Sequence, residues 1–299
     1  MDDTNDLKLN IACDVRINLH NVTTLPSTLA YLPQEWGIFC VVWPCLMAFG
    51  CLSNLSFIWT VWRTPALHTA TYFYLVCIAC ADLTSLICLG FTNVRGYVNG
   101  QTTRVRHAYD FFDIATNIVF AFAWVSSTGF VALVSLERFL AICHPIKHRV
   151  VTGTTRTLRL ICGTLVMSVA CNCTTIPSYL TIQEILVCIT WPADDKYIDY
   201  PQGAHALSMK SGITRVIPLF LYAMFWLAVV FSNCYMYTKI LLALRTRRHN
   251  TQLSLSHRFE NQMHQVAVMV ITNGWIFFFL VPYKFLLTQS VYWSCLELF

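Results

Sequence analysis

The sequence predicts an all-α membrane protein whose chain crosses the bilayer six times. Hydrophobic residues make up 56% of the 299 residues and charged residues only 12%, whereas a soluble domain carries roughly a quarter charged residues. The charges are also clustered, which leaves long windows with few or none. Each window has at least 23 residues, and about 20 suffice to cross roughly 30 Å of hydrocarbon. Because backbone in lipid must hydrogen-bond to itself, these windows are predicted to be helices.

The predicted transmembrane helices divide the chain into three parts. Five windows contain no charge, and the second contains a single one, Asp82. The six windows are 36–62, 71–94, 114–136, 160–183, 216–238 and 261–283. The chain therefore consists of a tail (1–35), a helical bundle with its loops (36–289) and a short remnant (290–299). The longest loop, 184–215, carries many charges and is predicted to be polar and solvated.

The distribution of basic residues predicts the orientation in the membrane. Seven of the 20 crowd two predicted connections on one side: Lys147, Arg149, Arg156, Arg159, Arg245, Arg247 and Arg248. Since Lys and Arg are enriched in cytoplasmic loops, we expect a multi-pass protein of the plasma membrane with an extracellular N-terminus. Asn21 begins a glycosylation sequon in the tail, which fits an exterior position, although sequons also arise by chance.

Most of the 14 cysteines lie inside the predicted helices, where cysteine behaves as a small apolar packing residue. Only Cys13, Cys188 and Cys295 fall in segments predicted to lie outside the cell, where disulfides are stable. Three cysteines allow at most one bridge among themselves.

Three polar residues are predicted to lie at similar depth inside the membrane. Asp82 is 11 residues from the inner end of its helix, and Ser127 is 11 residues before Arg138 at the end of the third helix. At 1.5 Å per residue this is about 16 Å. Asn54 in the first helix is slightly shallower. Such groups can simply bond neighbouring helices together, but an ionisable residue among them favours a site for a proton or a small cation such as sodium.

The most informative motif ends the third helix. Residues 135–145 read Ser-Leu-Glu-Arg-Phe-Leu-Ala-Ile-Cys-His-Pro. Glu137 and Arg138 alone could simply extend to the interface. The whole run, however, closely resembles the signature that ends helix three of rhodopsin-like G-protein-coupled receptors. The resemblance continues in the first two helices, where Asn54 and Asp82 match the family's helix-one asparagine and helix-two aspartate. In the sixth helix, Pro282 is similar to the family's proline.

The sequence also departs from the family pattern. Asp113 stands where the family has a helix-three cysteine, so Cys188, which resembles the loop partner, is left to pair with Cys13 or Cys295 or to stay free. Leu280 replaces the tryptophan of helix six. After Lys284 we find no seventh helix with its Asn-Pro-x-x-Tyr motif, so the rhodopsin-like bundle is expected to hold six of seven helices.

The resemblance implies how such a protein signals. Ligand binding shifts a two-state equilibrium, Glu137 holds Arg138 at rest, and release of Arg138 lets it meet a heterotrimeric G protein. The residues expected to serve coupling are Glu137, Arg138, Phe139, His144, Pro145 and Asn233. An asparagine at position 233 is similar to FMRFamide-type neuropeptide receptors.

The ligand pocket implied by the resemblance mixes charged and aromatic groups, which suits an extracellular peptide. Its expected residues are Asp110, Asp113, Phe120, Trp124, Leu280, Tyr283 and Lys284. Phe120 stands where amine receptors carry an aspartate, which argues against a monoamine. Asp113 and Lys284 are alternatively expected to pair with each other, and a partly wet pair stabilises little.

Other classes of function remain as alternatives. The missing helix favours a truncated, receptor-like protein that does not signal. An ion or solute transporter would use Asp82, but gives no reason for the motif at 135–145. An enzyme is not expected, because no nucleophile or metal-ligand cluster lies within a predicted helix, and no nucleic-acid partner is expected. Apart from the possible sodium ion near Asp82, we expect no cofactor.

Overall fold

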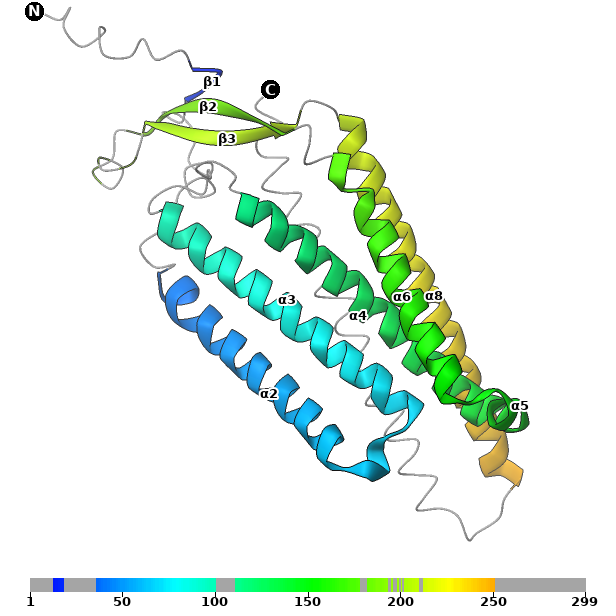
Figure 1. Ribbon diagram of the computed structural model, residues 1–299. Helices are drawn as coiled ribbons and strands as arrows, with labels where there is room; N and C mark the ends of the chain where they lie inside the picture. Colours follow the sequence, from blue (N-terminus) through cyan, green and yellow to red (C-terminus); the bar gives the residue numbers. More distant parts are fainter. Residues whose placement is uncertain are drawn as a thin grey trace, which may run out of the picture.

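Long helices confirm the predicted fold class, an all-α membrane protein with a helical bundle (Figure 1). The computed structural model describes residues 13–18, 36–100, 111–177, 182–192, 195, 198, 200, 202–209 and 212–250. Its helical elements are η3 (Ile38–Val42), α2 (Trp43–Arg63), η4 (Pro65–Leu67), α3 (Ala70–Gly100), α4 (Phe111–Cys143), α5 (Pro145–Val151), α6 (Thr154–Cys173) and α8 (Gly212–Asn250).

Four stretches of helix within the described residues are long and apolar enough to cross a membrane: Ile38–Arg63, Ala70–Arg95, Phe111–Cys143 and Val216–Thr246. They contain or overlap the first, second, third and fifth predicted windows. The helices run beyond the charge-free windows because their ends carry charged residues that the windows excluded. The predicted sixth helix, at 261–283, lies outside the described residues.

The fourth predicted helix is shorter than its window, since α6 ends at Cys173 and a strand begins at Ile182. Two hydroxyls bond carbonyls of the last turn: Thr174 Oγ1 lies 2.6 Å from Cys171 O, and Thr175 Oγ1 lies 2.7 Å from Asn172 O. Side-chain bonds of this kind compete with helix continuation. Absence of charge alone therefore did not locate this end.

α4 lies at the centre of the bundle and packs against α3, α6 and α8, with α5 at its C-terminal end (Figure 1). α4 contains nine buried residues, whereas Val61 is the one buried residue of α2. α2 instead exposes large side chains such as Phe49, Leu52 and Trp59. An apolar outer face of this kind suits contact with lipid.

A three-stranded sheet lies beyond one end of the helices, which we call the sheet end (Figure 1). Strand β1 (Val15–Asn18) pairs in parallel with β2 (Ile182–Thr190), which pairs antiparallel with β3 (Gly203–Met209). The segment 184–215, predicted to be a solvated loop, therefore contains most of β2 and all of β3. That prediction counted charges and overlooked the alternating Val187 and Ile189, both of which are buried.

The N-terminal tail is joined to this sheet. Cys13 forms a disulfide with Cys188, which selects one of the pairings that the sequence left open. Next to the disulfide, Asp14 N donates to Leu186 O at 3.0 Å and Leu186 N donates to Asp14 Oδ2 at 2.7 Å. Cys295, the other predicted candidate, lies outside the described residues.

Close packing of α4 on α6 depends on Gly129, which is buried. An ideal Cβ at Gly129 would lie only 2.6 Å from Thr164 Cγ2. The Thr164 side chain is fixed by its hydroxyl, which donates to Leu160 O at 3.0 Å. We therefore expect Gly129→Ala to lower the thermal unfolding midpoint of the purified protein, despite the gain in helix propensity of up to about 1 kcal/mol.

Gly163 on α6 provides the matched control, because no described atom lies within 4 Å of its ideal Cβ. Gly163→Ala should leave the midpoint unchanged or raise it. Adding Thr164→Ser to Gly129→Ala removes the clashing methyl group and should restore much of the loss. Equal midpoints for the two alanine variants would contradict the close approach of α4 and α6.

Candidate functional site

The carboxylate of Glu137 contacts side chains of three other elements. These contacts lie at the end of the bundle opposite the sheet, and we call this end the Glu137 end. Arg156 Nη1 of α6 lies 2.6 Å from Glu137 Oε1, and Tyr74 Oη of α3 donates to the same oxygen at 3.5 Å. His148 Nε2 of α5 lies 3.3 Å from Oε2. This contact is an ion-pair distance only, because Oε2 has no hydrogen-bond partner among the described residues. Glu137 itself is only 3% exposed.

Arg138, the next residue along α4, is exposed, and within the described part of the chain it has no ion pair. The expected Glu137–Arg138 pair is therefore not found. Successive residues of a helix point about 100° apart and do not face each other. Glu137 is buried while Arg138 is exposed, and no carboxylate of the described residues pairs with the guanidinium.

The other residues expected to serve coupling lie at the same end. Phe139 packs against the buried cluster of Tyr237, Ile240 and Leu244 on α8, and its ring centroid lies 5.4 Å from that of His144. His144 and Pro145, between α4 and α5, are both exposed.

Asn233 on α8 is 6% exposed, and neither its Nδ2 nor its Oδ1 has a hydrogen-bond partner among the described residues. One turn further on, Tyr237 Oη accepts from Ser135 Oγ of α4 at 3.1 Å. This bond was not predicted from the sequence. The two residues are 102 positions apart, so no local sequence pattern indicates that they meet.

The polar residues expected at mid-membrane are only partly brought together. Ser127 Oγ of α4 donates to Asp82 Oδ1 of α3 at 2.9 Å. Asn54 Nδ2 instead donates to Gly50 O of its own helix at 2.9 Å. The predicted three-residue cluster is thus an Asp82–Ser127 pair, with the amide donor of Asn54 engaged on α2. A carboxylate and a hydroxyl are oxygen ligands of the kind that hard cations prefer.

Towards the sheet end, aromatic and amide groups link α4, α6 and α8. The ring centroids of Trp124 and Tyr222 lie 6.2 Å apart at an interplanar angle of 72°, and Tyr222 Oη donates to Asn172 Oδ1 at 3.2 Å. Phe120 and Asp113 are half-buried on α4. Tyr222 and Asn172 are not among the predicted site residues, although an asparagine within a predicted helix was a signal for the second.

The remaining residues predicted for the ligand pocket and for modification lie outside the described residues. They are Asn21, Asp110, Leu280, Tyr283 and Lys284. Their assignment to ligand binding or glycosylation stays a prediction, as does the alternative pairing of Asp113 with Lys284.

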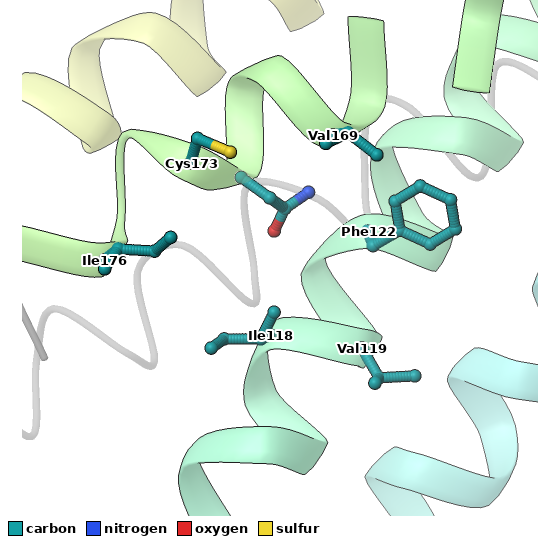
Figure 2. Close-up of a pocket in the computed structure, with 7 residues that line it drawn as sticks. Ile118, Val119, Phe122, Val169, Cys173 and Ile176 are labelled. Carbon is teal, nitrogen blue, oxygen red and sulfur yellow. The ribbon is translucent and has the colours of Figure 1, made fainter. Parts of the chain in front are cut away.

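A small cavity lies between α4 and α6 near Asn172 (Figure 2). Its volume is about 240 Å³, and its walls are formed by Ile118, Val119, Phe122, Val169, Asn172, Cys173 and Ile176. Drug-sized ligands occupy roughly 300–1,000 Å³ with several convergent polar groups. A cavity this small and this apolar does not by itself account for ligand recognition.

Comparison with known proteins identifies the class. The family model described as "7 transmembrane receptor (rhodopsin family)" matches residues 53–298. This is most of the chain, and the match includes the Glu137 end and the Asp82–Ser127 pair. The chain therefore belongs to the rhodopsin family of seven-transmembrane receptors.

Individual relatives are more distant. The thyrotropin-releasing hormone receptor of Mus musculus is 31% identical over 116 residues, which are 39% of this chain and 28% of that receptor. Olfactory receptor 51I1 of Homo sapiens is 27% identical over 148 residues, 49% of this chain and 44% of the relative. A Dopamine D2-like receptor of Drosophila melanogaster is 29% identical over 113 residues, 38% of this chain and 12% of the relative. The chain thus spans less than half the length of these relatives.

These matches confirm several predictions. The chain is a multi-pass membrane receptor, and its family is one of receptors rather than enzymes. The reported relatives are thyrotropin-releasing hormone, olfactory and dopamine receptors rather than FMRFamide-type receptors. The family match extends into residues outside the described part, and it does not confirm the expectation that helix seven is missing.

Tyr222 tests the polar link between α6 and α8. Tyr222→Phe removes the hydroxyl that donates to Asn172 and should destabilise the protein by about 1 kcal/mol, measured as a lower thermal unfolding midpoint. Tyr235→Phe is the matched control on the same helix, because Tyr235 is exposed and should tolerate the change. Similar midpoints for the two variants would show that the Tyr222–Asn172 bond does not stabilise the bundle.

Proposed function

We propose that this chain is a G-protein-coupled receptor that responds to an extracellular ligand and acts on a heterotrimeric G protein through Arg138. The observation that carries this proposal is the contrast between two adjacent residues. Glu137 is buried and anchored on three elements, while Arg138 is exposed without an ion pair in the described structure. A fixed helix end that presents an exposed cation suits recognition of an acceptor-rich helix end.

The proposed orientation places the sheet end outside the cell. The Cys13–Cys188 disulfide at that end requires an oxidising compartment. At the Glu137 end, Lys147, Arg149 and Arg245 are exposed, and such residues concentrate in cytoplasmic loops. Both observations support a plasma-membrane receptor with an extracellular N-terminal tail.

The proposed ligand is a peptide, in line with the predicted neuropeptide receptor. Thyrotropin-releasing hormone receptors are among the relatives, and a peptide suits a site beneath a sheet whose strands offer backbone hydrogen bonds. Phe120 stands where amine receptors carry an aspartate, so we do not extend the monoamine ligand of the dopamine receptor to this chain. The FMRFamide-type subclass rests on Asn233 alone and stays a prediction.

Replacing Arg138 tests coupling. The protein in membrane vesicles would be combined with purified heterotrimers of each major class. The assay would be run without peptide and with thyrotropin-releasing hormone or other amidated peptides. The quantity measured is the binding of a GTP analogue by the G protein, called uptake below. Arg138→Ala should lower uptake at least about tenfold, since a charged contact to a desolvated partner contributes on the order of 1.5–3 kcal/mol.

Arg63→Ala is the control for Arg138→Ala. Arg63 ends α2 at the same end of the bundle, where it lies over the Trp59 ring at 5.1 Å, and its loss should leave uptake unchanged. Uptake that survives Arg138→Ala would refute the role of Arg138. A folded wild-type chain that drives no uptake with any heterotrimer would instead favour the alternative of a receptor-like protein that does not signal, and solute flux in proteoliposomes would favour the transporter.

We further propose that the Asp82–Ser127 pair holds a sodium ion, to which the carboxylate would supply the charge and the hydroxyl a second oxygen. Replacing N-methylglucamine chloride by sodium chloride at equal ionic strength should raise the thermal unfolding midpoint, because a ligand that binds only the folded state stabilises it. Asp82→Asn should abolish this difference and Ser127→Ala should reduce it. A sodium effect that persists in Asp82→Asn would place the ion elsewhere.

A further inference from the structure

Arg156 makes the shortest polar contact to Glu137, with Nη1 at 2.6 Å from Oε1. Bonds between ionised partners at such distances are about twice as strong as neutral ones. The side chains of Arg156 and Glu137 are 21% and 3% exposed, so the pair is largely shielded from water. A carboxylate as buried as this one needs a partner, because an uncompensated buried charge costs several kcal/mol.

The pair also keeps the Glu137 carboxylate away from Arg138. Oε1 accepts from Arg156 and Tyr74, and Oε2 faces His148. Both oxygens are thereby directed at α3, α5 and α6, away from the outward-pointing side chain of Arg138. Lys147 and Arg149 on α5 and Arg159 on α6 are exposed cations in the same region, and none of them has an ion pair among the described residues.

We infer that Arg156 is a positioning residue for coupling: it holds the Glu137 carboxylate away from Arg138, so that the Arg138 guanidinium stays uncompensated and available to the G protein. The inference rests on the proposed function and names the regulation of the same site. When Arg156 is removed, the carboxylate keeps only the Tyr74 hydroxyl and the His148 ring as described neighbours, and it is then free to turn towards Arg138 on its own helix. The carboxylate then neutralises the Arg138 guanidinium and so opposes coupling.

This order of effects distinguishes positioning from simple stabilisation. Arg156→Gln should lower ligand-independent GTP-analogue uptake by about threefold or more, within the range that coupling residues produce. Glu137→Gln should lower uptake less than Arg156→Gln does, because it also removes the carboxylate that would neutralise Arg138. The double variant should behave like Glu137→Gln, since loss of Arg156 has no consequence without the carboxylate. If Arg156 only stabilised the fold, the double variant would stay as low as Arg156→Gln.

Arg159→Gln is the matched control. It removes the same charge from the same helix at an exposed position, and uptake should stay at the wild-type level. Arg156→Lys keeps the charge next to Glu137 and should retain most of the uptake. A lower uptake in Arg159→Gln equal to that in Arg156→Gln would mean that only net charge matters, which would overturn the inference.

A second measurement needs no G protein and separates this inference from the proposed function. Double-mutant cycles on the thermal unfolding midpoint of the purified full chain compare Glu137→Gln with Arg156→Gln and with Arg138→Gln. We expect a clear coupling between positions 137 and 156 and none between 137 and 138. The reverse pattern would overturn the inference, whereas the expected pattern in a chain without any nucleotide uptake would count against the proposed function alone.

Discussion

The buried carboxylate of Glu137 is the interaction on which the arrangement of one whole end of the bundle depends. A single side chain on the central helix accepts from α3 and α6 and faces α5. Because a buried charge tolerates little displacement from its partners, the ends of these elements are held in register with α4. The exposed face that results, with Arg138, His144 and Pro145, is therefore shaped by a contact that none of those residues makes.

Further along the bundle, neighbouring helices are joined by side-chain hydrogen bonds or by close packing at a glycine. Ser127 bonds Asp82 between α4 and α3, Ser135 bonds Tyr237 between α4 and α8, and Tyr222 bonds Asn172 between α8 and α6. Bonds of this kind contribute about 0.6–2 kcal/mol each in membranes. α2 is packed on α3 differently, through Gly50, where an ideal Cβ would lie 2.7 Å from Leu86 Cδ1. Position along the membrane is thus fixed by specific contacts, since apolar surface alone would let the helices slide.

The sequence predicts the helices well and their partners poorly, for a physical reason. Charge-free windows report the cost of charge in hydrocarbon, which acts on each helix separately, so the cores of α3, α4 and α8 are found. The pairing of Glu137 with Arg156 depends on which helix faces are turned towards each other, whereas the family resemblance had pointed to Arg138. The sheet escaped for another reason: the charges between β2 and β3 concealed the alternating apolar residues Val187 and Ile189.

The sheet end follows the same logic as the Glu137 end, with a covalent bond in place of an ion pair. Asp113, in the first turn of α4, stands where the resembled family has a cysteine, so α4 offers β2 no disulfide partner at that position. Cys13 takes that role instead, and β1 continues the attachment through backbone pairing of Val15 with Val187. The position of the β2–β3 hairpin therefore depends on the N-terminal tail rather than on the central helix. One end of α4 is consequently tied to its neighbours by a buried charge, while at the other end the hairpin is attached to the N-terminal tail by a disulfide and by backbone pairing.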